Sequence, residues 1–301
     1  MAINLSGVLL PTTTPFNDDE SVDSRALVTN INKWNQTGIT GYVLLGSTGE
    51  RVNLDEGEFL EAIETARRAV PETLSFIVGA GQQSTRGTIA EIDRAAKAGA
   101  EAVLVITPNY YRPAITQEAL ISHYASVADA AKIPVILYSM PDLTGITIGP
   151  GTAARLSEHE NIIGIKDSSN DVAKLRETIQ LCRSDFAVMI GNGTVFADAL
   201  RAGARGGILA VGCVVPELCL EIYRAVQAGQ DDRADELQDR LTPLARAVTK
   251  TYGIGGLKAA MDIVGYAGGA VRAPLRRAGA DAVAEIGQLL REAMNVSEAG
   301  A

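Results

Sequence analysis

The chain has 301 residues, of which 47% are hydrophobic and 21% charged, the balance of a folded globular protein rather than a disordered chain or a coiled-coil rod. Its formal net charge is −9, and no basic run is interleaved with aromatic residues, so we expect no nucleic-acid partner. No apolar stretch approaches the ~20 residues that a spanning helix needs. The first residues also lack the basic region of a signal peptide. We therefore expect a cytoplasmic protein without a membrane partner.

The cysteines and histidines give little support for a metal site or a histidine-based catalytic triad. Three cysteines (Cys182, Cys213 and Cys219) lack the spacing of metal ligands, and the chain has only two histidines. Reduced thiols are the simpler interpretation of the cysteines. We expect no bound metal.

Short apolar runs recur along the first 225 residues. Each has four to six residues, mostly leucine or β-branched, without clean polar alternation, which is typical of parallel strands covered on both faces. Amphipathic helical stretches lie between the runs. The eight runs cover residues 7–10, 41–45, 75–80, 102–107, 134–138, 162–166, 187–191 and 207–211.

Glycines and polar residues mark where the helices begin and end. Three helical stretches end in a similar phrase, QTGITG, KAGAEA and RAGARG, in which Gly38, Gly99 and Gly203 can adopt the left-handed cap conformation. Asn53, followed three residues later by Glu56, predicts the start of another helix.

Eight strands that alternate with helices predict a (β/α)8 barrel over residues 1–225. Residues 226–301 contain no further strand-like run and predict a C-terminal helical extension. A doubly wound open sheet would alternate in the same way, but no GxGxxG turn follows the first strand.

Active sites of such barrels lie at the carboxyl ends of the strands, where the sixth run ends on Lys166. If this strand alternates, Ile162, Gly164 and Lys166 share one face, and the glycine leaves room beside the lysine. Burial disfavours the charged form of an amine, and a neutral amine attacks carbonyl carbons. The alternative is a strand-end lysine paired with a carboxylate. The other six lysines fall on helices or connections, so none competes strongly with Lys166.

Two further strand ends carry groups that could bind a carboxylate or transfer a proton. The GSTGE turn offers the hydroxyls of Ser47 and Thr48 and the backbone amides of a turn flexed at Gly49, which can hold a carboxylate. Tyr138 ends the fifth run and could move a proton beside an ammonium or iminium group. The alternatives are an ordinary turn, held by Glu50, and an aromatic residue that caps the core.

The loop GNGT after the seventh run could bind a phosphate, although no clear helix begins on it. Tyr110 and Tyr111 after the fourth run have the same two alternatives as Tyr138, a role in proton transfer or an aromatic residue that caps the core.

Three spaced motifs, GSTGE, YSMPDLTG and GIKDSS, make the chain resemble the dihydrodipicolinate synthase and N-acetylneuraminate lyase family of Schiff-base (class I) aldolases. The resemblance runs from TTTPF to RAPL, nearly the whole chain. It implies the same barrel with a helical tail, assembled as a homotetramer made of two dimers. It also implies a small 2-oxo acid as partner, typically pyruvate.

The resemblance also assigns roles to individual residues. Lys166 would form the Schiff base, Ser47, Thr48 and Gly49 would hold the carboxylate of the 2-oxo acid, and Tyr138 would move the proton. Tyr110 would reach the site of a neighbouring subunit and form a hydroxyl relay with Ser47. The carbonyl of Ile208 would face the same pocket, and Ser168 and Asn192 would contact the distal part of the substrate. Because the iminium is itself an electron sink, no cofactor is expected.

The identity of the second substrate rests on smaller features. In the synthase, an arginine two residues after the proline of the tyrosine motif binds the aldehyde's carboxylate, whereas this chain has Leu143. PNYYRP, YSMPDLTG and the YGIGGLK…RAPL segment look closest to 4-hydroxy-2-oxoglutarate aldolases, although Thr48 stands where the mitochondrial form has asparagine. We therefore expect cleavage of 4-hydroxy-2-oxoglutarate to pyruvate and glyoxylate.

Several alternatives stay open beside this expectation. They are condensation of pyruvate with aspartate semialdehyde by dihydrodipicolinate synthase (4-hydroxy-tetrahydrodipicolinate synthase), another pyruvate-dependent sugar-acid aldolase or dehydratase, a non-catalytic keto-acid-binding barrel, and a phosphate-binding barrel enzyme.

Overall fold

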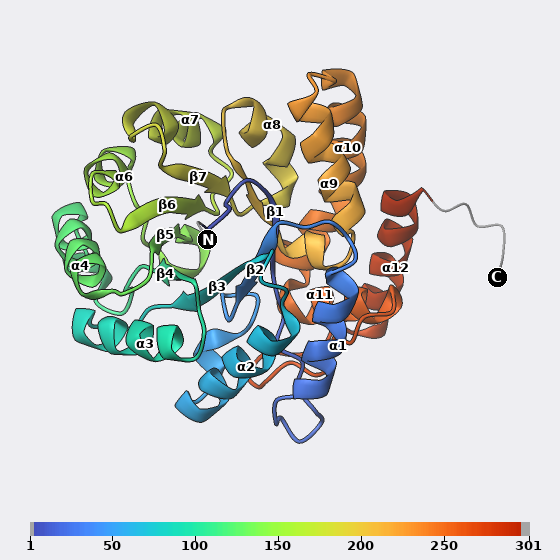
Figure 1. The fold of residues 1–301 in the computed structure, drawn as a ribbon. Helices are drawn as coiled ribbons and strands as arrows, with labels where there is room; N and C mark the ends of the chain where they lie inside the picture. Colours follow the sequence, from blue (N-terminus) through green and yellow to red (C-terminus); the bar gives the residue numbers. More distant parts are fainter. Residues whose placement is uncertain (1–2, 296–301) are drawn as a thin grey trace.

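Eight short parallel strands close into one barrel in the computed structural model, which describes residues 3–295 (Figure 1). Each strand pairs with the next one in the chain, and β8 pairs with β1. The predicted (β/α)8 barrel is confirmed. The strands are β1 (Gly7–Pro11), β2 (Gly41–Leu44), β3 (Ser75–Ala80), β4 (Ala102–Ile106), β5 (Val135–Ser139), β6 (Ile162–Asp167), β7 (Ala187–Ile190) and β8 (Gly206–Ile208).

Seven strands agree with the predicted runs within one residue at each end, but β8 does not. The run 207–211 was expected to be extended, whereas the strand covers only Gly206–Ile208 and a 3₁₀ helix follows over Ala210–Cys213. The amide of Leu209 still bonds to the carbonyl of Leu9 on β1 at 3.2 Å. After Leu209, the backbone amides bond to carbonyls three residues back, as in the bond from Gly212 to Leu209 at 3.0 Å. Apolar composition alone therefore predicted too long a strand.

Helices cover the outside of the barrel and end where the glycines predict. Gly38, Gly99 and Gly203 have φ values of 89°, 107° and 107°, so all three are left-handed as expected. The helices are α1 (Ser24–Trp34), α2 (Glu56–Ala69), α3 (Thr85–Lys97), α4 (Gln117–Ala130), α5 (Pro141–Thr144), α6 (Pro150–Ser157), α7 (Val172–Leu181), α8 (Phe196–Arg201), α9 (Pro216–Gln227), α10 (Asp231–Arg246), α11 (Gly253–Ile263) and α12 (Ala280–Met294).

The start of α2 was predicted two residues too early. The N-cap is Asp55, whose carboxylate accepts from the Glu58 amide at 2.8 Å, while the Glu58 carboxylate accepts from the Asp55 amide at 3.0 Å. Asn53 instead ends a short 3₁₀ helix that closes the preceding turn. Asp55 and Glu58 have the same spacing as Asn53 and Glu56, so spacing alone does not tell which pair begins the helix.

Two apolar layers fill the molecule, one inside the barrel and one between the strands and the helices. The inner layer includes Leu9, Val43 and Ile136, and the outer layer contains Ile162. Strict alternation had placed Ile162 inside with Gly164. The prediction for Ile162 is wrong because the register between β5 and β6 shifts at a bulge. Val135 pairs there with Ile162, and Ile136 pairs with Gly164.

After α9, the chain forms α10, α11 and α12, which gather on the side of the barrel that carries α9 and α1 (Figure 1). A five-residue π-helical turn, Ala247–Thr251, joins α10 to α11 and lies over the carboxyl-terminal mouth of the barrel. No helix within residues 3–295 has the length and apolar character needed to cross a membrane.

Candidate active site

Lys166 lies near the end of β6 and projects into a cavity of about 420 Å³ at the carboxyl ends of the strands. Its side chain is buried, with only 4% of the residue exposed. Among residues 3–295, its amine forms neither an ion pair nor a hydrogen bond, because the adjacent Asp167 pairs with Lys174 at 2.8 Å. The alternative, a lysine paired with a carboxylate, is therefore wrong for Lys166. The amine is left for a ligand.

Tyr138 stands beside Lys166 on the neighbouring strand. The two residues are register partners of β5 and β6, and the amine lies 4.5 Å from the centre of the Tyr138 ring. The phenol oxygen of Tyr138 lies 2.9 Å from the hydroxyl oxygen of Ser47, and either group can be the donor. The amine, a phenol and an aliphatic hydroxyl thus meet on three different strand ends.

The turn after β2 presents donors to the same cavity. Ser47 and Thr48 both line it, and their backbone amides have no acceptor within the described chain. Two adjacent free amides with two hydroxyls form a site that suits a carboxylate. Gly49 does not contribute an amide, because its N–H donates to the Gly46 carbonyl at 3.0 Å. Its lack of a side chain matters for packing, since a Cβ there would lie 2.9 Å from the Cα of Leu45.

Glu50 fixes this turn to the C-terminal part of the chain. It has a left-handed backbone with φ of 55° and a buried carboxylate. One oxygen accepts from Lys258 of α11 at 2.6 Å, and the other accepts from the Arg272 amide at 3.1 Å. Burial lowers the pKa of Lys258, an effect that the charge of Glu50 opposes. Glu50 therefore holds the turn.

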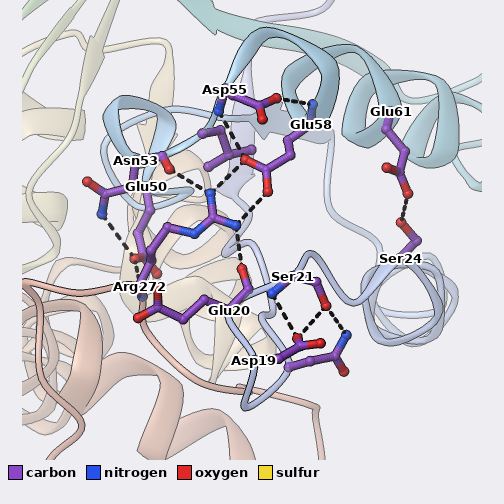
Figure 2. A network of polar contacts seen from close by, with 12 residues as sticks. Asp19, Glu20, Ser21, Ser24, Glu50, Asn53, Asp55, Glu58, Glu61 and Arg272 are labelled. Atoms are coloured by element: carbon purple, nitrogen blue, oxygen red, sulfur yellow. Dashed lines mark hydrogen bonds and ion pairs between the residues drawn. The ribbon is translucent and has the colours of Figure 1, made fainter.

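Arg272 extends the same network toward α2, as Figure 2 shows. Its guanidinium binds both carboxylate oxygens of Glu58 at 2.6 Å and the Asn53 carbonyl at 2.6 Å. The paired guanidinium lowers the pKa of Glu58. The bidentate pair joins the C-terminal segment to the helix that follows the turn.

Three other predicted residues also line the cavity. Ser168 and Asn192, expected to contact the distal part of a substrate, line it, and so does Ile208, whose carbonyl was expected to face this pocket. Gly191 leaves the space that these groups need: a Cβ there would fall on the hydroxyl of Ser168 and 2.7 Å from Cε of Lys166. The GNGT loop continues into a 3₁₀ turn and the six-residue α8, so it does not start a helix of the kind that holds phosphate.

Several cavity residues did not stand out in the sequence. Met140, Asp142 and Asn170 follow predicted strand ends, so a closer reading of those loops could have found them. Thr249, Lys250 and Ile254 come from the segment after α10, for which spacing gave no signal. All six line the cavity of Lys166.

Tyr110 and Leu143 differ in where the structure places them. Tyr110 is 76% exposed and lines neither the cavity of Lys166 nor the adjoining one, while its ring packs edge-on against Tyr111 with centroids 5.0 Å apart. Leu143 lines both cavities and is 61% exposed. The single chain therefore brings together every predicted site residue except Tyr110 and the Gly49 amide.

Comparisons with known proteins agree on one family. The model of the dihydrodipicolinate synthetase family matches residues 4–293. The 4-hydroxy-tetrahydrodipicolinate synthase of Bartonella bacilliformis is 36% identical over 279 residues, which cover 90% of this chain and 92% of that protein.

Solved structures resemble the whole barrel. A dihydrodipicolinate synthase from Bacillus anthracis has a TM-score of 0.92 at 28% identity, covering 96% of this chain and 99% of that one. A prophage protein of the dihydrodipicolinic acid synthase family from E. coli K12, solved with pyruvate, has a TM-score of 0.89 at 27% identity, covering 96% and 99%. Neither these two nor the Bartonella protein is named as a 4-hydroxy-2-oxoglutarate aldolase.

Proposed function

The chain belongs to the dihydrodipicolinate synthetase family, and we propose that Lys166 forms a Schiff base with a 2-oxo acid whose pyruvate unit stays on the lysine. The family makes the protein a carbon–carbon lyase of the class I, pyruvate-dependent type. The observation that carries the assignment to Lys166 is a buried amine without a protein partner, in a cavity beside the hydrogen-bonded hydroxyls of Tyr138 and Ser47.

The chemistry follows from these groups. The neutral amine attacks the 2-oxo carbon, and water leaves to give an iminium. As the 4-hydroxyl loses its proton, the bond between the third and fourth carbons breaks, its electron pair forms an enamine, and the fourth carbon leaves as an aldehyde. Protonation of the enamine at the third carbon gives an iminium again, and water hydrolyses it to release pyruvate and restore the lysine amine. Tyr138 moves the protons to and from the reacting atoms, with Ser47 as its hydrogen-bond partner. The amides and hydroxyls of Ser47 and Thr48 hold the first carboxylate.

We take 4-hydroxy-2-oxoglutarate, cleaved to pyruvate and glyoxylate, as the leading substrate. Its support is the likeness of PNYYRP, YSMPDLTG and the YGIGGLK…RAPL segment to 4-hydroxy-2-oxoglutarate aldolases. Leu143, which lines the cavity, also departs from the synthase, where an arginine at this position binds the aldehyde's carboxylate. No arginine lines the cavity of Lys166 in the described chain. The adjoining cavity has Arg51, but the buried carboxylate of Glu91 pairs with it.

A second candidate is condensation of pyruvate with aspartate semialdehyde, the synthase reaction. The names of the curated relatives favour it, because the Bartonella protein and a 35% identical relative from Methanopyrus kandleri are both 4-hydroxy-tetrahydrodipicolinate synthases. By name alone this candidate is the better supported. We rank it second because Leu143 stands in the cavity wall where the synthase has its arginine.

Trapping tests the shared chemistry. The protein is incubated with pyruvate and borohydride, and the covalent mass increase is mapped by peptide analysis. We expect the adduct on Lys166 and none in Lys166→Ala, with both proteins folded. An adduct elsewhere, or none where a control aldolase is trapped, would reject the proposal and favour a keto-acid-binding barrel. Pyruvate release from 4-hydroxy-2-oxoglutarate is then compared with condensation, and faster condensation would reverse our order of candidates.

We also propose that the protein assembles as a homotetramer made of two dimers and that Tyr110 acts in a neighbouring subunit's site. The support is the exposure of Tyr110 and Tyr111 on the loop after β4, with Val52 exposed on the loop after β2. Light scattering after size exclusion tests the assembly. Tyr110→Phe should lower turnover without changing the mass of the particle, and full activity in a monomer would contradict the role.

A further inference from the structure

The cavity of Lys166 contains a second lysine, Lys250, which the chemistry above does not use. It comes from the π-helical turn between α10 and α11, more than 80 residues further along the chain. The amine of Lys166 is consumed when the imine forms. Within residues 3–295, Lys250 is the other cationic side chain that lines this cavity, and its amine is not bonded to the 2-oxo carbon.

The backbone of the π-helical turn places Lys250 at the cavity. The Tyr252 amide donates to the Ala247 carbonyl at 2.9 Å, five residues back, which inserts one residue relative to an α-helix. Val248, Thr249 and Lys250 consequently line the cavity in succession. Such single-turn insertions are frequent at functional sites.

No carboxylate neutralises Lys250. Among residues 3–295 its amine forms no ion pair and no hydrogen bond, unlike Lys174 and Lys258, which pair with Asp167 and Glu50. One acid, Asp142, lines the same cavity without pairing with it. The amine is therefore available to an anionic ligand.

We infer that Lys250 binds the distal carboxylate of the substrate, so that the enzyme acts on 2-oxo acids with a second acidic group. This rests on the proposed function, because the first carboxylate and the 2-oxo group must be held at Ser47, Thr48 and Lys166. Both candidate reactions involve a second carboxylate, and Leu143 cannot bind one. Asn170 and Asn192, which are hydrogen-bonded to each other, line the wall and can add amide contacts.

Competition against pyruvate trapping tests the inference without assuming which reaction is catalysed. The probes are 2-oxoglutarate and 2-oxopentanoate, which have the same chain length and differ only in a terminal carboxylate or methyl group. Each is titrated against borohydride trapping of pyruvate in the full-length protein and in Lys250→Met. We expect the variant to bind 2-oxoglutarate about two- to fivefold more weakly, within the range for an exposed ion pair. Its affinities for 2-oxopentanoate and pyruvate should be unchanged.

Two further variants sharpen the result. Lys132→Met, on an exposed lysine outside the cavity, should leave all three affinities unchanged. Asp142→Asn should strengthen binding of 2-oxoglutarate, because it removes a negative charge from the same wall.

The outcomes separate the inference from the proposed function. Equal losses for 2-oxoglutarate and 2-oxopentanoate in Lys250→Met, or no loss for either, would overturn the inference while pyruvate trapping on Lys166 still stands. Absence of trapping in the unmodified protein would reject the proposed function, and the inference with it.

Discussion

The amine of Lys258 lies 2.6 Å from a carboxylate oxygen of Glu50, and the two side chains are only 2% and 1% exposed. The amine also donates to the carbonyls of Thr14 and Ala270, at 2.7 and 2.6 Å, so three partners surround it. The pair joins α11 to the turn that carries Ser47. The α11 helix therefore holds the turn of Ser47 and Thr48 in place.

Replacing Lys258 by methionine should destabilise the protein and loosen that turn. Removing one partner of a buried ion pair typically costs about 3–5 kcal/mol, because the other charge stays buried without compensation. We expect a lower melting temperature and weaker pyruvate binding, measured by thermal unfolding and by titrated trapping.

Two controls separate stability from binding. Glu101→Gln breaks the Arg67–Glu101 pair, which lies where β4 begins, at the opposite end of the barrel, so it should lower stability without weakening pyruvate binding. The double variant Glu50→Gln/Lys258→Met should recover part of the lost stability, because no buried charge remains. Unchanged pyruvate affinity in Lys258→Met would show that the pair does not hold the turn for binding.

Tyr138→Phe should lower turnover by about 100-fold or more, the usual contribution of a positioned general acid and base. The phenol's protein hydrogen bond is to Ser47, in the cavity, so the melting temperature should change little. Steady-state pyruvate release and thermal unfolding check the two statements. Ser47→Ala, which removes the other member of the pair, should reduce turnover less, and a Tyr138→Phe enzyme with normal turnover would contradict the role.

Gly191→Ala should block the cavity. The new Cβ would fall on the hydroxyl of Ser168 and 2.7 Å from Cε of Lys166, so both side chains would have to leave their present positions in the cavity. We expect trapping with pyruvate to slow by about tenfold or more, since small misplacements of reacting groups cost large factors in rate. Gly151→Ala on α6 has no atom within 4 Å of the new Cβ and serves as the matched control. Equal trapping rates in both variants would show that the lysine adapts.

The strands and the inner part of the site could be predicted because their signals are local. Runs of β-branched residues gave seven strands, and the position of Lys166 at a strand end placed it in the cavity. Errors arose where two local solutions compete, as at the α2 cap and at the bulge that turns Ile162 outward. Composition does not distinguish such solutions.

The contributions of the C-terminal segment could not be predicted in the same way. Lys250 and Lys258 fall on helical stretches, and nothing in their spacing indicates a cavity or a buried carboxylate. Their roles depend on how the segment after α9 crosses the mouth of the barrel, so long-range packing decides them.

His123 should make stability depend on pH near neutrality. Its ring is 7% exposed, Nδ1 lies 2.9 Å from the Thr85 hydroxyl, and the buried Nε2 has no hydrogen-bond partner in the described chain. Burial lowers its pKa from the ordinary value of 6.5. Between the lowered pKa and 6.5, the unfolded chain binds more protons than the folded protein, so folding stability rises with pH there.

The melting temperature should therefore fall as the pH is lowered from 7.5 to 5.5, and His123→Gln should flatten that slope. The window lies above the range where carboxylates such as Glu58 take up protons, since pairing with Arg272 lowers the pKa of Glu58 from 4.5. Thermal unfolding at several pH values in one buffer series measures both slopes. A variant whose slope equals that of the unmodified protein would assign the dependence to another group, because the neutral amide of glutamine cannot take up the proton.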